Sequence, residues 1–296
     1  MPGSDPQASR SAVLVAQARA VADGRIAVGR FSDPVAVRLL DGDERAGVAR
    51  ARSSERPTTF ADRVPDEMLR ATAEHMAVRT IAVDEAVRAA GHRQLVLLGA
   101  GLDARAWRMS GLHDTAVLEV DQPASQADKR RRVTAAGDLP LVAARHAFVP
   151  VDLARTPLAP ALAAAGFDAT VPTTWVWEGV VMYLTPAQVE ATLGQVTALS
   201  APGSLLAVHY TTRSLLTRAG RALFQVAARR AGADPLAHEP NRSAWSPGRM
   251  GRLLAAHGFV TSEDRSLLDL AADLGLVPER TGSLRAGRLV LATRTG

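Results

Sequence analysis

The stretch Leu95-Val96-Leu97-Leu98-Gly99-Ala100-Gly101-Leu102-Asp103 decides the fold that we expect for this chain. A short apolar run that ends in a glycine turn is typical of a strand buried on both faces of a parallel sheet. Glycine has no Cβ, so a Gly-x-Gly turn lets the backbone approach a ligand closely. Open α/β sheets bind ligands at this carboxyl edge. We therefore place Gly99, Gly101 and Asp103 in a candidate ligand site; the alternative is a tight turn without a ligand.

Strand and helix patterns alternate after this stretch. Six further strands are expected, at residues 116–120, 146–151, 173–177, 204–210, 259–266 and 288–294. Helices are expected between them, at residues 123–136, 186–199 and 246–257. This alternation predicts an α/β fold of seven strands, mostly parallel, with helices on both faces.

The segments outside this pattern are expected to be helical additions to the sheet. Residues 11–29 and 34–40 have helical periodicity, residues 42–65 are expected to be irregular, and Pro65 is expected to start a helix that ends near Ala90. We divide the chain accordingly. The division is an N-terminal helical cap at 1–90, a core at 91–212 and 246–296, and an inserted helical lid at 213–245.

An acidic pair follows the first strand at the distance expected of a nucleotide-binding sheet. Asp121 closes the segment Glu119-Val120-Asp121, about 20 residues after Gly101. A carboxylate at the end of the second strand can accept hydrogen bonds from a ribose diol. The alternative is that Asp121 caps the helix starting at Pro123, since aspartate is a good N-cap residue.

Two further strand ends carry polar residues. Asp152 and Leu153 follow the third strand and can hold an adenine, although an aspartate at such a junction is also ordinary turn chemistry. Glu178 and Gly179 follow the fourth strand, with Tyr183 shortly after. A carboxylate there can attract a sulfonium or an ammonium group.

The ligand that these residues predict is cationic and lacks phosphate. The turn has no third glycine of the dinucleotide fingerprint, because position 104 is Ala and position 105 is Arg. Asp103 follows the turn directly, and its charge would repel a pyrophosphate. S-adenosylmethionine fits these features better than NAD does.

Composition excludes several classes of protein. The chain has 296 residues, of which 47% are hydrophobic, enough for one large α/β domain. The net charge is +5, but the basic residues are scattered and Lys129 is the only lysine, so we expect no nucleic-acid partner. No cysteine is present, which excludes disulfides and thiolate metal sites.

The remaining expectations concern metals and membranes. The histidines show no metal-ligand spacing, so no metal is expected. The first ten residues contain no apolar run of the signal-peptide type, and no stretch of about 18 apolar residues occurs. We expect a cytoplasmic protein with a small-molecule acceptor and no membrane contact; the sequence does not indicate an oligomeric state.

The four motifs together resemble the leucine carboxyl methyltransferase-like family. The motifs that carry the resemblance are Gly99 to Asp103, Glu119 to Pro123 followed by Lys129, Asp152-Leu153, and Glu178-Gly179 through Tyr183-Leu184. The resemblance covers residues 76–199 well and the C-terminal part more loosely. It implies a Rossmann-like class I methyltransferase sheet with an antiparallel last strand. The most similar subgroup contains bacterial O-methyltransferases that use S-adenosylmethionine, some of which esterify polyketide carboxyls.

The resemblance also implies roles for individual residues. Arg79 would hold the methionine carboxylate of the donor, which suits a bidentate guanidinium, and Glu178 would hold its amino group. Gly99 and Gly101 would line the methionine portion, Asp121 would bind the ribose, and Asp152 with Leu153 the adenine. Gln122 and Gly179 would also contact the donor. S-adenosylhomocysteine would be the second product.

The nature of the methyl acceptor stays open between two chemistries. A carboxylic acid is ionised at pH 7 and needs no base, whereas a hydroxyl needs one. The candidate catalytic residues for such a base are Tyr183 and His209; His209 can equally be a hydrogen-bonded structural residue. Arginines of the insertion could orient an acid. An NAD(P)-dependent oxidoreductase and a binding protein without activity are the alternatives of other classes.

Overall fold

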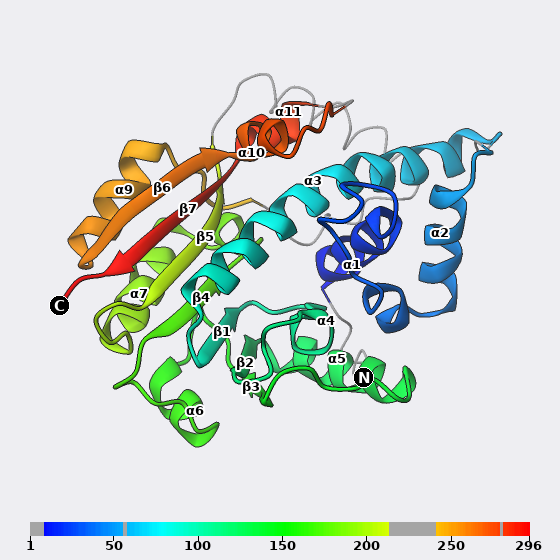
Figure 1. The fold of residues 1–296 in the computed structure, drawn as a ribbon. Helices are drawn as coiled ribbons and strands as arrows, with labels where there is room; N and C mark the ends of the chain where they lie inside the picture. The colour runs from blue at the N-terminus through cyan, green and yellow to red at the C-terminus, as the bar shows by residue number, and fades with distance from the viewer. Residues whose placement is uncertain (1–8, 56–57, 213–240, 279–280) are drawn as a thin grey trace, which may run out of the picture.

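The computed structural model describes residues 9–55, 58–212, 241–278 and 281–296. This part of the chain contains one seven-stranded sheet with the order β3-β2-β1-β4-β5-β7-β6 (Figure 1). The strands are β1 Gln94–Leu98, β2 Ala116–Asp121, β3 Arg145–Pro150, β4 Thr173–Trp177, β5 Leu205–Thr211, β6 Phe259–Ser266 and β7 Gly287–Arg294. β1 to β5 pair in parallel, and β7 is antiparallel to both of its neighbours. The predicted fold class is confirmed.

Successive side chains along each strand point to opposite faces of the sheet, so the strands contribute to two cores, one on each face. Val96 and Leu98 of β1 join the core that contains Trp175 and Trp177, while Leu95 and Leu97 point into the other core. All five residues of β1 are buried. Continuous apolar strands of this kind are stable only where helices cover both faces of a parallel sheet.

Helices cover both faces (Figure 1). One core includes side chains of α6 Leu158–Ala164, α7 Pro186–Ala198 and α9 Pro247–Ala256. The other includes side chains of α3 Phe60–Ala90, α4 Arg105–Arg108, α10 Leu267–Asp273 and α11 Thr281–Ala286. α5 Pro123–Ala135 lies between β2 and β3 in the chain and packs on β3. No helix of the described ranges is long and apolar enough to cross a bilayer.

The N-terminal segment packs as a separate group of helices against α3. Its elements are α1 Arg10–Ala22, the 3-10 helix η1 Ala36–Leu39 and α2 Gly42–Arg52. A third apolar core joins α1 and α2 to the middle of α3, from Leu69 to Ile81. Figure 1 shows this group beyond the β3 side of the sheet, with α3 running from it across the sheet.

Two predictions for this segment are wrong. Residues 42–65 are not irregular, because α2 forms with a capping box between Asp41 and Glu44. α3 starts at Phe60, and Pro65 lies inside it. In the second turn, a proline removes only one early hydrogen bond of a helix that has about seven further turns to stabilise it.

The other predicted helix and strand boundaries agree with the observed ones within a few residues, with one exception. The helix expected over 11–29 ends at Ala22, and Gly24 with a φ of 67° follows. α4, α6, α10 and α11 were not predicted, because each has only four to seven residues. Of the lid predicted at 213–245, residues 213–240 lie outside the described residues, and residues 241–245 are not helical.

Candidate functional site

The carboxyl ends of four neighbouring strands meet at one edge of the sheet. The Gly99 N–H donates to Val120 O at 2.7 Å, and the Gly101 N–H donates to Asp121 Oδ2 at 2.6 Å. The Val151 N–H donates to the Asp121 carbonyl at 2.8 Å. These bonds join the ends of β1, β2 and β3, and β4 pairs with β1 on the other side. The sequence-predicted positions therefore lie along one edge.

A larger residue would be strained at either glycine of the turn. Gly99 has a φ of 69°, and a Cβ there would lie 2.2 Å from Val180 Cγ2. A Cβ on Gly101 would lie 3.0 Å from the Cβ of Ala12 in α1. The first helix thus covers the turn, and Arg19 of α1 donates to the Leu102 carbonyl at 2.5 Å.

Asp121 faces this turn instead of capping the next helix. Its Oδ1 accepts the Gln122 N–H at 2.7 Å, and the N-cap residue of α5 is Gln122. The alternative reading of Asp121 as a cap is therefore wrong. A carboxylate has about four acceptor positions, so two remain for a ligand. Burial raises the pKa of Asp121, while the Gly101 and Gln122 amides and the Lys129 charge act in the opposite direction.

A turn at Asp152 follows the end of the third strand, β3. Asp152 Oδ1 accepts the Ala154 N–H at 2.9 Å, and the Asp152 carbonyl accepts the Thr156 N–H at 2.8 Å. This is the turn chemistry weighed as an alternative from the sequence. Leu153 packs against the larger core. Asp152 remains partly exposed, so its carboxylate is accessible as well as structural.

Arg79 and Glu178 lie against each other at the end of β4. Arg79 Nε donates to Glu178 Oε1 at 2.6 Å, and both side chains are about nine-tenths buried. Gly179, with a φ of 74°, leaves room for the Arg79 guanidinium. Burial acts to raise the pKa of Glu178, but the guanidinium groups of Arg79 and Arg105 outweigh it and hold that pKa well below its usual range.

Arg105 is a central residue of the site that the sequence analysis missed. It is 1% exposed and donates to Glu178 Oε2 at 2.9 Å, to Asp84 Oδ1 at 2.7 Å and to Asp103. Asp103 is therefore neutralised by Arg105, and its charge does not exclude a pyrophosphate as the sequence argument assumed. Asp103 and Arg105 are two residues apart in the sequence, but nothing there showed that Glu178 would pair with Arg105.

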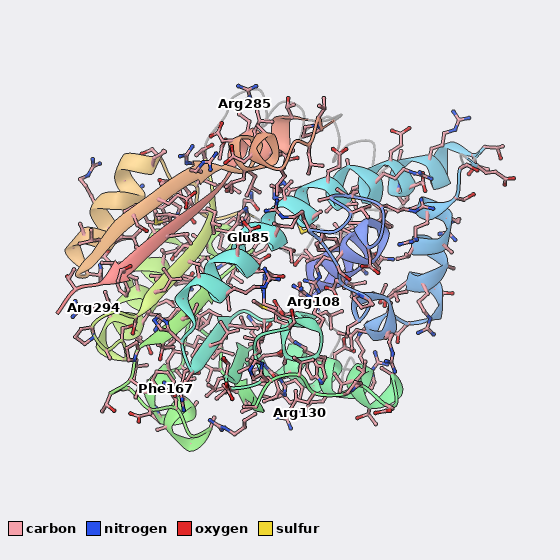
Figure 2. The ribbon with its side chains drawn as sticks, viewed as in Figure 1. Glu85, Arg108, Arg130, Phe167, Arg285 and Arg294 are labelled. Atoms are coloured by element: carbon pink, nitrogen blue, oxygen red, sulfur yellow. The ribbon has the colours of Figure 1, made fainter. Side chains whose placement is uncertain are left out.

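The ion pairs continue from Arg105 to the N-terminal helices. Arg108 pairs with Asp84 at 2.7 Å and with Asp33 at 3.3 Å, and Asp33 pairs with Arg19 at 2.9 Å. Arg108 lies beside α3, close to α1 (Figure 2). This buried network contains four positive and four negative side chains. They are Arg19, Arg79, Arg105 and Arg108, and Asp33, Asp84, Asp103 and Glu178. Its charges balance, as buried charges must.

Of the two candidate bases, His209 is the better defined. It lies on β5 with a ring centroid 5.8 Å from that of His75, and it is 1% exposed. Neither of its ring nitrogens has a hydrogen-bond partner within the described residues. Burial, followed by the charge of Arg79, lowers the pKa of His209 well below its usual value. Tyr183 ends the 3-10 helix η2 Val181–Tyr183 and is half-buried.

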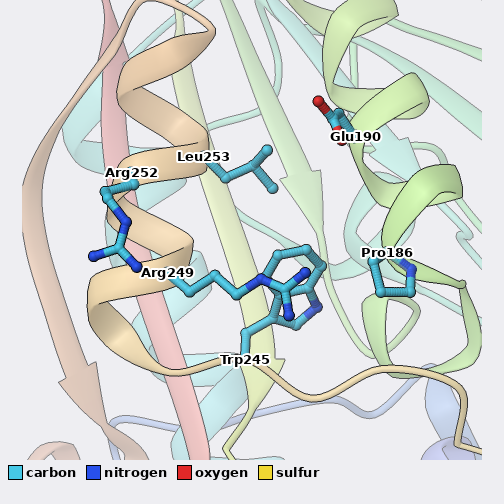
Figure 3. Close-up of a pocket in the computed structure, with 6 residues that line it drawn as sticks. All are labelled: Pro186, Glu190, Trp245, Arg249, Arg252 and Leu253. Carbon is cyan, nitrogen blue, oxygen red and sulfur yellow. The ribbon is translucent and has the colours of Figure 1, made fainter.

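A separate pocket of about 370 Å³ opens between α7 and α9 (Figure 3). The residues that line it are Pro186, Glu190, Trp245, Arg249, Arg252 and Leu253. Arg249 extends across the indole of Trp245, with its guanidinium carbon 4.6 Å from the ring centroid. None of the predicted site residues lines this pocket.

The donor set at the strand ends suits a ligand without phosphate. The amides of Gly99, Ala100 and Gly101 all donate to β2 or to Asp121. A pyrophosphate site needs such amides to be free to point at the ligand. The oppositely charged Arg79 and Glu178 match an α-amino-acid head instead. Among the described residues no group of three potential metal ligands occurs.

The sheet order and this edge define a Rossmann-like class I methyltransferase. The family model of leucine carboxyl methyltransferase matches residues 12–197, more than half of the chain. The chain belongs to this family, as its motifs predicted. S-adenosylmethionine, the methyl donor expected from the sequence, is the donor of its class.

Individual relatives agree with this assignment. A protein of Mycobacterium bovis, provisionally named an S-adenosyl-L-methionine-dependent methyltransferase, is 36% identical over 284 residues, covering 90% of this chain and 89% of the relative. A protein of Mycolicibacterium gilvum with the same name is 44% identical over 176 residues, 58% of this chain and about half (52%) of the relative's length.

Solved structures support the fold. A DUF574 family protein from Streptomyces avermitilis has a TM-score of 0.55 at 16% identity, covering 98% of this chain and 99% of that protein. A provisionally named methyltransferase from Thermobifida fusca has a TM-score of 0.53 at 18% identity, covering 95% and 94%. These likenesses concern the fold alone.

Proposed function

We propose that this chain is an S-adenosylmethionine-dependent O-methyltransferase that esterifies the carboxyl group of a small-molecule acid, of the polyketide or other secondary-metabolite kind. The observation that carries the proposal is the buried pair Arg79–Glu178 beside the glycine turn and Asp121. Each part of this arrangement has a counterpart in the donor molecule.

The charges at the edge match the two ends of the donor. Arg79 would bind the α-carboxylate, Glu178 the α-ammonium, and the free acceptor positions of Asp121 the ribose diol. An amino-acid head has no net charge, so inserting it between Arg79 and Glu178 keeps the buried network balanced. Asp152 and Leu153 would contact the adenine beyond β3. The bound donor would present an electrophilic methyl group.

The environment of His209 favours an acceptor that arrives already ionised. A buried imidazole with a depressed pKa is a weak base, so it would remove a hydroxyl proton poorly. A carboxylate oxygen needs no such help. It forms a bond to the methyl carbon, the carbon–sulfur bond breaks, and its electron pair stays on sulfur. The protein then contributes mainly alignment, which can lower a barrier by about 7–11 kcal/mol.

The turn also argues against the oxidoreductase alternative. Its three amides are occupied within the protein, as described above, and Asp121 takes the Gly101 N–H. This supports a donor without pyrophosphate more directly than the sequence argument from Asp103 did.

A methyl-transfer assay with base treatment tests the proposal. The protein is incubated with methyl-labelled S-adenosylmethionine and a panel of acids, each paired with its alcohol or phenol analogue. An ester releases labelled methanol under base, and an ether does not. We expect label in methanol from acids, loss of transfer in Asp121→Asn, and little change in His209→Gln.

The opposite pattern would support hydroxyl transfer. Label retained in a base-stable ether, together with a loss of about 10²–10⁴-fold in His209→Gln, would overturn the carboxyl assignment. Transfer that survives Asp121→Asn with unchanged donor affinity would overturn the placement of the donor at this edge.

A further inference from the structure

Behind Asp121 lies a buried cluster that the proposed reaction does not use. Glu119 precedes Asp121 by two residues on β2, so both side chains are on the same face of the sheet. Glu119 Oε2 pairs with Lys129 of α5, and the two side chains are 0% and 1% exposed. His146 Nε2 of β3 lies 3.2 Å from Glu119 Oε1.

The surroundings fix the ammonium in place. Lys129 Nζ lies 5.4 Å from the centroid of the Trp107 ring, a cation–π distance. The ring of His146 packs 4.6 Å from the same indole. Gln126 Nε2 donates to the Glu119 carbonyl at 2.8 Å, which joins α5 to β2 a second time.

The identity of the basic residue is informative. Every other basic residue of the Lys/Arg kind in the chain is arginine, yet the position facing Glu119 holds the single lysine. An ammonium is a compact point charge, whereas a guanidinium is a broad planar fork. The enclosure formed by Glu119 and Trp107 holds the compact group.

We propose that Lys129 is a positioning residue of the donor site: by neutralising Glu119 it keeps Asp121 ionised and able to accept the ribose hydroxyls. This rests on the proposed function, in which Asp121 binds the ribose. Glu119 alone would put a second buried negative charge beside Asp121, and like charges in a poorly solvated site disfavour ionisation.

The charged groups acting on Asp121 are few. Burial raises its pKa, Lys129 lowers it and Glu119 raises it, with the Gly101 and Gln122 amides also lowering it. His146 also contacts Glu119, at 3.2 Å. Removing Lys129 should therefore raise the pH at which Asp121 takes up its proton, and removing Glu119 should lower that pH.

The test measures binding of S-adenosylhomocysteine by calorimetry across the acid range, independently of activity. Affinity should fall as the pH drops through the pKa of Asp121. Lys129→Met should move this fall upward by about 0.5–1 pH unit, and Glu119→Gln should move it downward by a similar amount. The double variant should return near the wild-type position. On the falling limb, each pH unit of displacement is about a tenfold change in affinity.

Two control variants separate the explanations. Arg130→Met removes an exposed charge from the same helix and should not change the pH at which the affinity for S-adenosylhomocysteine falls. His146→Gln measures the contribution of His146 in the same range. If Lys129→Met does not fold, Glu119→Gln and the double variant still differ only in the Lys129 charge.

The outcomes are distinguishable. Shifts in the same direction for both single variants, or no shift, would mean that the cluster is only structural and would overturn the inference. Asp121→Asn tests the proposed function separately: unchanged affinity there would remove the ribose role itself. Loss of affinity in Asp121→Asn without opposite shifts would leave the proposed function standing and the inference wrong.

Discussion

Gly99 shows how a single residue can be fixed by its neighbour. Its φ of 69° is shared with Gly275, but only Gly99 has a side chain in the way of a Cβ, at 2.2 Å from Val180 Cγ2. Gly275 has nothing within 4 Å. The two glycines form a matched pair, because the backbone strain is the same at both and the steric clash occurs at one.

We expect Gly275→Ala to lower the free energy of unfolding by about 1 kcal/mol, the cost of a positive φ with a Cβ. Gly99→Ala should cost about 1–3 kcal/mol more, because the clash is added to the strain. Urea denaturation of both variants measures the difference. Adding Val180→Ala to Gly99→Ala should recover part of it; equal costs at the two glycines would show that the packing at the turn is looser than described.

The sequence located those site residues whose side chains are polar or glycine and which also stand at the end of a predicted strand. Gly101, Asp121 and Glu178 lie at the same edge because each ends a parallel strand, and parallel strands end on one side. Arg105 could not be found in this way. Its importance comes from Asp84 and Glu178, which lie 21 and 73 residues away along the chain.

Among the elements, α1 contacts the turn after β1 through the buried side chain of Arg19 as well as by packing. Arg19 is 5% exposed, donates to the Leu102 carbonyl and pairs with Asp33, which is fully buried. Removing one side chain of a buried ion pair leaves the other charge uncompensated, and this lowers the free energy of unfolding by about 3–5 kcal/mol in the most buried cases.

We expect Arg19→Gln to loosen α1 more than the sheet. Hydrogen–deuterium exchange should accelerate at residues 10–22, while β1 should keep its protection as far as the protein remains folded. Arg25→Gln, an exposed arginine just after α1, is the control and should change neither. Equal acceleration in α1 and β1 would mean that α1 unfolds only together with the whole domain.

The elements also show where sequence patterns carry information. β4 has the predicted bounds, because a run of buried residues between turn residues marks a strand clearly. β6 also has the predicted bounds, although only Phe259 and Ser266 of its residues are buried. α2 was missed because only Val48 and Ala51 of its residues are buried, which gives no apolar period to detect. Its Asp41–Glu44 capping box was the available signal.

For the whole molecule, the buried histidines determine how stability depends on pH. Burial lowers the pKa of His75 to about 3 and that of His209 well below 6.5. The unfolded chain then binds these protons near pH 6.5 and the folded protein does not. Stability should therefore fall as the pH drops below about 6.5, before most carboxylates titrate.

Between pH 7 and pH 5 we expect a loss of roughly 2 kcal/mol for each histidine that stays neutral in the folded protein. Asp84 and Glu178, whose pKa values are lowered, should add their losses only in more acidic solution. Urea midpoints measured across this range give the slope. His75→Gln should flatten it, whereas His113→Gln, at an exposed position, should not. An unchanged slope in His75→Gln would contradict this account.

The enclosure of Lys129 has a consequence for chemical labelling of the protein. Apart from the α-amino group, the chain offers acylating reagents one primary amine, and that amine is 1% exposed and paired with Glu119. A reagent can reach it only when α5 separates from β2. The extent of acylation at this position is thus a direct record of how often α5 separates from β2.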